Sequence, residues 1–297
     1  MEALPQRTAL QTRSTLKFKR RYQSIFAYKL GESRILVPVC ARVAELQCPK
    51  RRTKMINKTL GILELENKPM MHPGALSAPG TFEFPVNRLT VPGATTRNVV
   101  DGDLEVKDAY IRGARQLEDE GAAAIIANCG FSAVFQAEVS AAVSIPVALS
   151  SLLLVPLVAK TLPPGRKVGI ITYDASKLKD NHLVAVGWSS REIAVAIAGI
   201  EGSESWYQFA QPVPVVSQAL LISDVMTAVK SLVKTEPAVG AFVFECAGFP
   251  LTAGAVRAET GLPVADYVSL AKILIEMIPP SRKSSTIQCG CSYTSAQ

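Results

Sequence analysis

A chain of 297 residues, 48% of them apolar, is long enough to bury a sizeable core in one large domain or in two of ordinary size. The net charge of +7 comes from residues 1–58, which hold 14 Lys and Arg against 3 Asp and Glu, so the rest of the chain is slightly acidic. Because a groove that follows phosphates needs its basic residues on the folded body, we expect no nucleic-acid partner.

The basic N-terminal segment, residues 1–57, has the composition of a disordered extension or of an organellar transit peptide. The sequence contains no apolar run of the about 18 residues that span a bilayer, and this segment has no secretory hydrophobic region. We therefore predict a cytoplasmic protein without a membrane partner, or import into mitochondria if residues 1–57 are a transit peptide. Residues 279–297 are predicted to form a C-terminal tail.

The cysteines are too sparse for a disulfide scaffold; they stand at positions 40, 48, 129, 246, 289 and 291. Cys289 and Cys291 have a C-x-C spacing, but a second cysteine pair at ligand spacing is lacking and the chain has only two histidines. A zinc site is not expected from this set. We predict neither a metal nor a cofactor.

From residue 58 onward, apolar strands alternate with helical patterns, which predicts parallel strands joined by crossover helices. The long loop at residues 67–85 is rich in Pro and Gly and is of the kind that often carries function. In chain order we expect a strand at 58–65, a helix at 106–121, a strand at 122–129, a helix at 132–144, a strand at 145–150 and a helix at 150–165.

The second half repeats this order, with a strand at 166–174, a helix at 225–238, a strand at 239–246 and a helix and strand within 253–268. Cys129 lies 17 residues before Pro146, and Cys246 lies 17 residues before Pro263. The fold class is therefore predicted as α/β, with two pseudo-symmetric half-domains at 58–162 and 163–278, the site between them, and the last helix of the second packing on the first.

Cys129 and Cys246 both end predicted strands, and each is followed by small residues and then a helix. In parallel sheets, ligands bind beyond the carboxyl ends of the strands, where unpaired amides and helix dipoles can hold a carboxylate and lower the pKa of a thiol. A single cysteine in an apolar strand is usually a packing residue. A matched pair instead predicts that one thiol removes a proton from carbon while the other returns one.

The motifs "NCGF" and "ECAGFP", together with "LGILELENKPMMHPGALSAPGTFEFPV" and "SIPVALSSLLLVPLVAKTLPPGRKVGIIT", resemble the aspartate/glutamate/hydantoin racemase superfamily over about residues 58–278. This resemblance implies two α/β domains around one site and a cysteine from each domain as acid or base without cofactor or metal. It also implies that the substrate is bound by residues beside the cysteines and at one strand end, namely Asn128, Gly130, Phe131, Thr172, Ala247 and Gly248, with Tyr173 adjacent.

The chain departs from the amino-acid racemases of that family, which usually have Asn-Thr after each cysteine where this chain has Gly-Phe and Ala-Gly-Phe. The substrate is therefore expected to be a more apolar carboxylate or a cyclic amide, and a homo-oligomer is left open. Further candidates for substrate contact are Glu66 and Asn67 after the first strand, and Ser150 and Ser151, of which one is expected to cap a helix.

We predict an isomerase, a racemase or epimerase in which Cys129 and Cys246 invert a carbon next to a carboxylate or cyclic amide carbonyl. One alternative is a decarboxylase or a cis–trans isomerase of the same superfamily, acting on malonate-like or maleate-like acids. An alternative of another class is a non-catalytic protein that binds a small molecule on the same fold.

Overall fold

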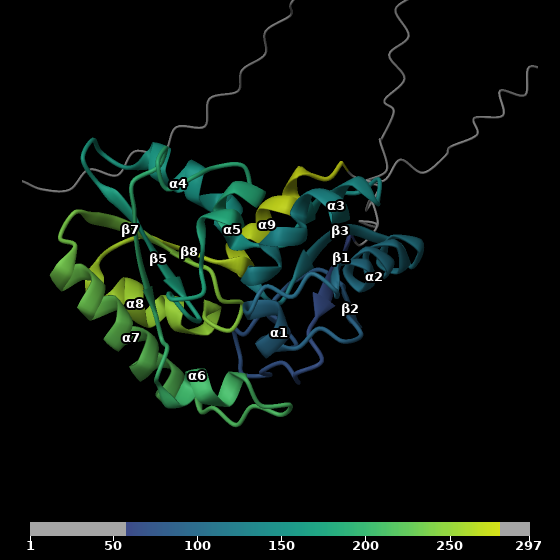
Figure 1. The fold of residues 1–297 in the computed structure, drawn as a ribbon, viewed down its shortest axis with the longest axis horizontal. Helices are drawn as coiled ribbons and strands as arrows, with labels where there is room; N and C mark the ends of the chain where they lie inside the picture. Colours follow the sequence, from purple (N-terminus) through teal and green to yellow (C-terminus); the bar gives the residue numbers. More distant parts are fainter. Residues whose placement is uncertain (1–57, 280–297) are drawn as a thin grey trace, which may run out of the picture. The chain divides into compact units, whose positions relative to one another are not determined.

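The computed structural model describes residues 58–279, so the predictions for residues 1–57 and for the C-terminal tail from residue 280 lie outside the described part. Two parallel sheets of four strands form the centre of this part, with strand orders β2-β1-β3-β4 and β6-β5-β7-β8. In Figure 1 the first sheet is labelled at β1, β2 and β3 and the second at β5, β7 and β8. The predicted α/β fold of two pseudo-symmetric halves is confirmed.

The first half has short strands and helices of unequal length. Its strands are β1 (Thr59–Glu64), β2 (Val86–Thr90), β3 (Ala122–Ala127) and β4 (Val147–Ala148). Its helices are α1 (Thr96–Val100), α2 (Lys107–Asp119), the 3-10 turn η1 (Gly130–Phe135), α3 (Gln136–Ala141), the 3-10 turn η2 (Ser151–Leu154) and α4 (Val155–Thr161). The predicted helix at 132–144 is thus a 3-10 turn followed by a short α-helix.

The second half repeats the strands of the first in the same order. They are β5 (Lys167–Thr172), β6 (Val195–Gly199), β7 (Val239–Phe244) and β8 (Val264–Ala265). Its helices are α5 (Asp180–Ala185), α6 (Glu204–Phe209), α7 (Gln218–Thr235), the 3-10 turn η3 (Pro250–Thr252), α8 (Ala253–Thr260) and α9 (Tyr267–Met277). The half-domain bounds at 162 and 163 stay a prediction.

The pairing registers support the predicted internal repeat. The first strand of each half pairs with its neighbour through one irregularity, between Thr59 and Leu60 in β1 and between Lys167 and Val168 in β5. These positions are equivalent when the two halves are aligned on Gly61 and Gly169. The same irregularity at the same place in two sheets is what a duplicated half-domain would retain.

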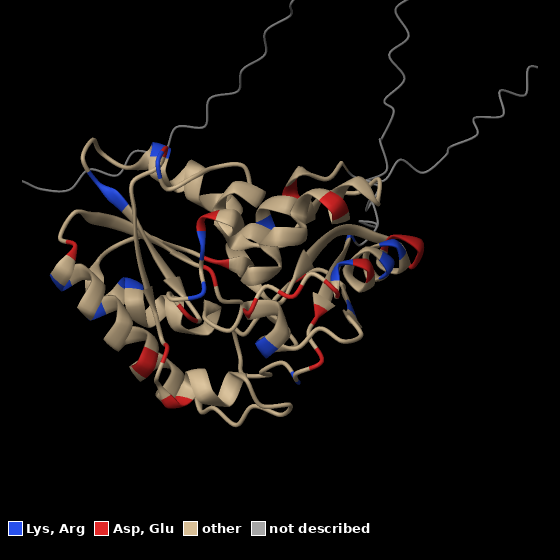
Figure 2. Cartoon of the chain, in the orientation of Figure 1, with Lys and Arg blue, Asp and Glu red and all other residues tan. Residues whose placement is uncertain are grey.

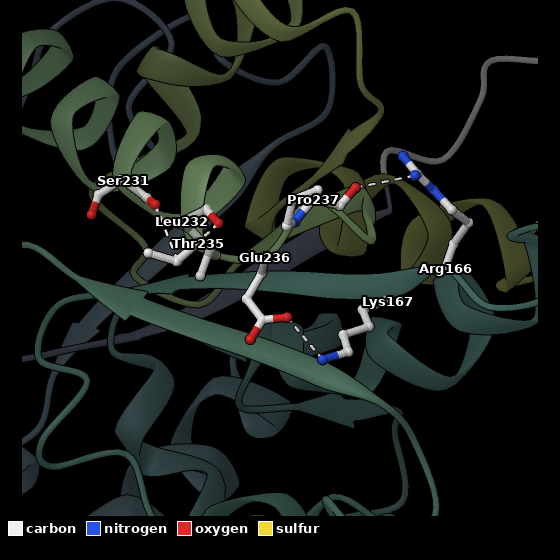
Figure 3. A network of polar contacts seen from close by, with 7 residues as sticks. All are labelled: Arg166, Lys167, Ser231, Leu232, Thr235, Glu236 and Pro237. Atoms are coloured by element: carbon white, nitrogen blue, oxygen red, sulfur yellow. Dashed lines mark hydrogen bonds and ion pairs between the residues drawn. The ribbon is translucent and has the colours of Figure 1, made fainter.

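The start of β5 is held to the start of β7 by surface polar contacts, shown in Figure 3. Lys167 Nζ lies 2.8 Å from a carboxylate oxygen of Glu236, and Arg166 donates to the carbonyl of Pro237 at 3.2 Å. Both partners of the ion pair are more than a third exposed, so the pair adds little stability.

Buried apolar side chains join the two halves into one body. One core cluster includes residues of both sheets, such as Ile125 of β3 and Phe242 of β7. A second cluster packs α9 on the first sheet, with Leu270 and Leu274 against Leu60. The indole nitrogen of Trp188 also donates to the carbonyl of Leu152 in η2 at 3.0 Å. The two rows of strand ends are therefore held at fixed places.

Charged residues are interspersed over the described surface (Figure 2). Within residues 58–279 no helix is both long and apolar enough to cross a bilayer. Among the same residues no group of three or more His, Cys, Asp or Glu side chains is placed to hold a metal ion.

Candidate active site

The two strand-end cysteines occupy matching places in the two sheets. Cys129 follows β3 in an extended conformation (φ −140°, ψ 121°), is 8% exposed and directly precedes η1. Cys246 follows β7 and is partly exposed. Both thiols are free, so the structure contains no disulfide between them.

Both cysteines line one pocket, which has about 700 Å³ of space counted out to its open mouth. Residues of both halves line it, as predicted for a site between two half-domains. Of the predicted site residues, those at the pocket are Asn67, Asn128, Cys129, Gly130, Phe131, Tyr173, Cys246, Ala247 and Gly248. The structure thus brings together most of the residues that the sequence singled out.

The two predicted serines lie behind the pocket instead of lining it. Ser150 accepts a hydrogen bond from the backbone N–H of Leu152 and so caps η2, as expected for one of the pair. Ser151 donates its hydroxyl to the carbonyl of Phe244, at 2.6 Å. Both side chains are fully buried and used in fixing η2 against β7, which leaves them no place for substrate contact.

Two other predicted residues also lie away from the pocket. Thr172 ends β5, is fully buried, and donates its hydroxyl to a carboxyl oxygen of Glu245 at 2.7 Å. Glu66 is exposed and accepts a hydrogen bond from the backbone N–H of Gly93 at 2.8 Å, beside a separate, polar depression. Thr172 therefore acts on a pocket residue, and Glu66 fixes a turn.

The predicted long loop, residues 67–85, reaches across to the second half and borders the pocket. Asn67 donates its side-chain amide to the carbonyl of Gln211 at 2.7 Å. The ring of His72 lies 2.6 Å from the carbonyl of Val216, so this histidine ties the loop down and is not at the pocket. These contacts fix one wall of the pocket by segments far apart in the sequence.

Sequence reasoning missed a pocket residue, Glu245. Its side chain is fully buried; one carboxyl oxygen accepts from Thr172, and the other, Oε1, has no hydrogen-bond partner. Glu245 precedes Cys246 as Asn128 precedes Cys129, so the repeat itself carried the signal. Asn128 fixes its own oxygen by accepting the backbone N–H of Leu65, at 2.9 Å.

Glu245 also accounts for the glycine after Cys129. A Cβ placed on Gly130 would stand 2.5 Å from the carboxyl carbon of Glu245 and overlap its Oε1 and its backbone carbonyl oxygen. A side chain at this position therefore cannot coexist with Glu245 in its present place. The expectation that Gly130 lets amides approach an anion stays a prediction, because the space beside this glycine is occupied by a carboxyl group.

The thiols are not acidic in the empty pocket, contrary to expectation. Burial and the carboxyl group of Glu245 raise the pKa of Cys129 to about 12, although the backbone amides of Phe131 and Ser132 act to lower it. The same two causes raise the pKa of Cys246 well above its usual value. Burial also raises the pKa of Glu245, to about 7. Desolvation thus outweighs the helix-end amides, and both cysteines are neutral near pH 7.

Comparison with curated proteins finds relatives along most of the chain. A dimethylsulfoniopropionate lyase of Durusdinium sp. clade D is 28% identical over 235 residues, covering 76% of this chain and 77% of that protein. Dimethylsulfoniopropionate lyase 3 of Emiliania huxleyi (strain CCMP1516) is also 28% identical, over 73% of this chain and 59% of its own length. No family model matches the chain.

Two solved structures illustrate the similarity of fold. A glutamate racemase isoform from Bacillus anthracis is 14% identical with a TM-score of 0.49, covering 74% of this chain and 81% of that one. A variant of arylmalonate decarboxylase is 16% identical with a TM-score of 0.48, covering 74% and 94%.

The chain resembles the aspartate/glutamate/hydantoin racemase superfamily. Its own two parallel sheets carry the fold that this resemblance implied. The relatives named here are enzymes, which supports the prediction of an enzyme in its general form. The lyase relatives carry the name of a reaction other than the predicted isomerisation.

Proposed function

We propose that this chain is a lyase that removes a proton from the carbon next to a carboxylate, by means of a cysteine thiolate, and expels a leaving group from the adjacent carbon. The observation that carries the proposal is the pair of free cysteines, from equivalent strand ends, in one pocket. The lyase relatives support elimination over inversion as the outcome of that proton removal.

For dimethylsulfoniopropionate the chemistry balances with one base. The thiolate takes a proton from the carbon next to the carboxylate, the electron pair left behind forms the carbon–carbon double bond, and the bond from carbon to sulfur breaks. The products are acrylate, neutral dimethyl sulfide and one proton, which the thiol returns to water. Because the sulfide leaves as a neutral molecule, the leaving group needs no proton from the enzyme.

The residues around the thiols suit this reaction. Asn128 has its oxygen held by Leu65, and its amide nitrogen makes no hydrogen bond to the described residues, so this N–H group can donate to a substrate carboxylate. Lys68 also lines the pocket and supplies a positive charge for the same end of the substrate. Charge that develops on the carboxylate during proton removal is then stabilised by fixed donors.

The experiment is to incubate the purified chain with dimethylsulfoniopropionate and to measure dimethyl sulfide by gas chromatography and acrylate by NMR. We expect both products in equal amounts. Replacing the base, in either Cys129→Ser or Cys246→Ser, should lower kcat/KM about 10² to 10⁴-fold. Cys48→Ser, in the predicted N-terminal extension, is the matched control. Product formation that survives both pocket substitutions would refute the proposal.

The second candidate is the predicted racemase or epimerase, which the presence of a thiol on each side of the pocket favours. Inversion needs both thiols, because one removes a proton and the other returns one on the opposite face. Elimination needs only one base, so one of the two cysteine variants should then be affected much less. In deuterated water, deuterium in recovered chiral substrate indicates racemisation, whereas release of carbon dioxide from malonates indicates decarboxylation. A non-catalytic binding protein would show none of these products.

A further inference from the structure

Glu245 is a buried acid without a partner of opposite charge. Its side chain is fully buried and lines the pocket, and Oε1 has neither a hydrogen-bond donor nor an ion pair among the described residues. Thr172 donates to the other oxygen only. A buried carboxyl group in this condition is costly to ionise, and a cation placed in the pocket would remove much of that cost.

The pocket wall near Glu245 is aromatic and apolar. Tyr173 and Phe209 both line the pocket, with ring centroids 6.3 Å apart, and Tyr173 is held by donating its hydroxyl to the carbonyl of Trp206 at 2.8 Å. Met70 lies on the same side, since a Cβ on Gly248 would meet both its methyl group and the Phe209 ring. Aromatic faces and methyl-sized apolar contacts are what cations with methyl substituents bind.

We propose that Glu245 is the counter-charge for a methylated cationic group, so that the pocket selects small zwitterions, with a sulfonium or quaternary ammonium centre and a carboxylate, over dicarboxylates. This inference rests on the proposed function, whose site it specifies. A dicarboxylate would place its second negative charge against the unpaired Glu245, where burial makes the repulsion strong.

The same charge pairing activates the base. Glu245 raises the pKa of both pocket thiols, so a bound cation that offsets its charge shifts each thiol toward thiolate. The substrate then supplies the condition for its own proton removal. An empty pocket keeps its thiols protonated and inert.

The test uses two ligands of equal size, neither of which contains sulfur: 3-(trimethylammonio)propionate and its uncharged isostere 4,4-dimethylpentanoate. Binding of each is measured by calorimetry at pH 8 in the full chain, with no turnover required. We expect the cation to bind at least about 10-fold more tightly than the isostere. Glu245→Gln should bring the two affinities within about 3-fold, while Glu236→Gln, the surface control of Figure 3, should keep the preference.

The wild-type chain gives a second measurement that does not depend on the folding of a variant. The preference for the cation should rise between pH 6 and 8.5, because Glu245 ionises with a pKa of about 7. The other titratable groups that act on it are Cys129, Cys246, Tyr173 and Tyr267, and all stay neutral over this range because burial raises their pKa.

A preference that is absent, or that is unchanged in Glu245→Gln and independent of pH, overturns the inference. Cation preference without release of dimethyl sulfide would refute the proposed reaction and retain the ligand class. Release of dimethyl sulfide without any cation preference would do the reverse.

Discussion

The contact between Gly130 and Glu245 allows a test of the geometry of the pocket. In Gly130→Ala the new Cβ would lie 2.5 Å from the carboxyl carbon of Glu245 and would overlap two of its oxygens, one of which belongs to the backbone. The side chain can turn away, but the carbonyl cannot move without shifting β7. We expect a loss of about 2 to 3 kcal/mol in the free energy of unfolding, near the upper end for overpacking.

The assay is urea unfolding followed by circular dichroism, with thermal unfolding as a check. For a folded part of this size, the predicted loss lowers Tm by about 4 to 12 °C. The matched control is Gly254→Ala in α8, where a Cβ would meet nothing within 4 Å, and helix propensity predicts a gain of up to about 1 kcal/mol.

The double variant with Glu245→Ala apportions the clash. Removing the carboxyl group relieves the overlap with the side chain and leaves the overlap with the carbonyl, so part of the stability should return. We expect a coupling energy of about 1 kcal/mol or more. Gly130→Ala as stable as wild type, or two substitutions that simply add, would show that these groups are not in contact.

Four further outcomes are expected. At pH 8 a thiol with a pKa of about 12 is thiolate in about one molecule in 10⁴, so alkylation of Cys129 by iodoacetamide, followed by mass spectrometry, should be far slower than that of free cysteine, and Glu245→Gln should accelerate it. Because the pKa of Glu245 is raised in the folded state, the stability it contributes is present at pH 4.5 and is lost as pH rises through about 7; urea unfolding of wild type relative to Glu245→Gln should decline over that interval, and a constant difference would contradict the assignment. Trp188→Phe, which deletes the hydrogen bond to Leu152, should cost about 1 to 3 kcal/mol by the same measurement, and no loss would refute its role in joining the halves. Lys167→Met, at an exposed ion pair, should change stability by less than about 1 kcal/mol, and a larger effect would contradict the weak contribution assigned to it.

The parts of the fold that could be predicted are those with a strong apolar signal. β1, β3, β5 and β7 are buried along nearly their whole length, so their sequences read as continuous apolar runs. β2, with the sequence VNRLT, is an edge strand with mixed exposure and has no such run. Its place beside β1 is fixed by backbone pairing, which a sequence pattern does not reveal.

The site shows a similar division. Cys129 and Cys246 could be found because strand ends and an equal spacing to proline are properties of the sequence. Glu245 could not be recognised as buried, because an acid at the end of an apolar strand normally faces water. Its burial follows from how the loop after β3 packs against the end of β7, a contact between residues more than a hundred positions apart. Thr172 was predicted as a substrate contact but instead donates to this acid.

The duplication that built the pocket also left its two sides chemically unequal, since an amide, Asn128, precedes one cysteine and an acid, Glu245, precedes the other. A symmetric pocket would treat both faces of a methylene carbon alike. Here the carboxyl group distinguishes them, so of two hydrogens on one prochiral carbon the enzyme should remove a single one. The two enantiomers of a stereospecifically deuterated substrate would then give products that differ in deuterium content.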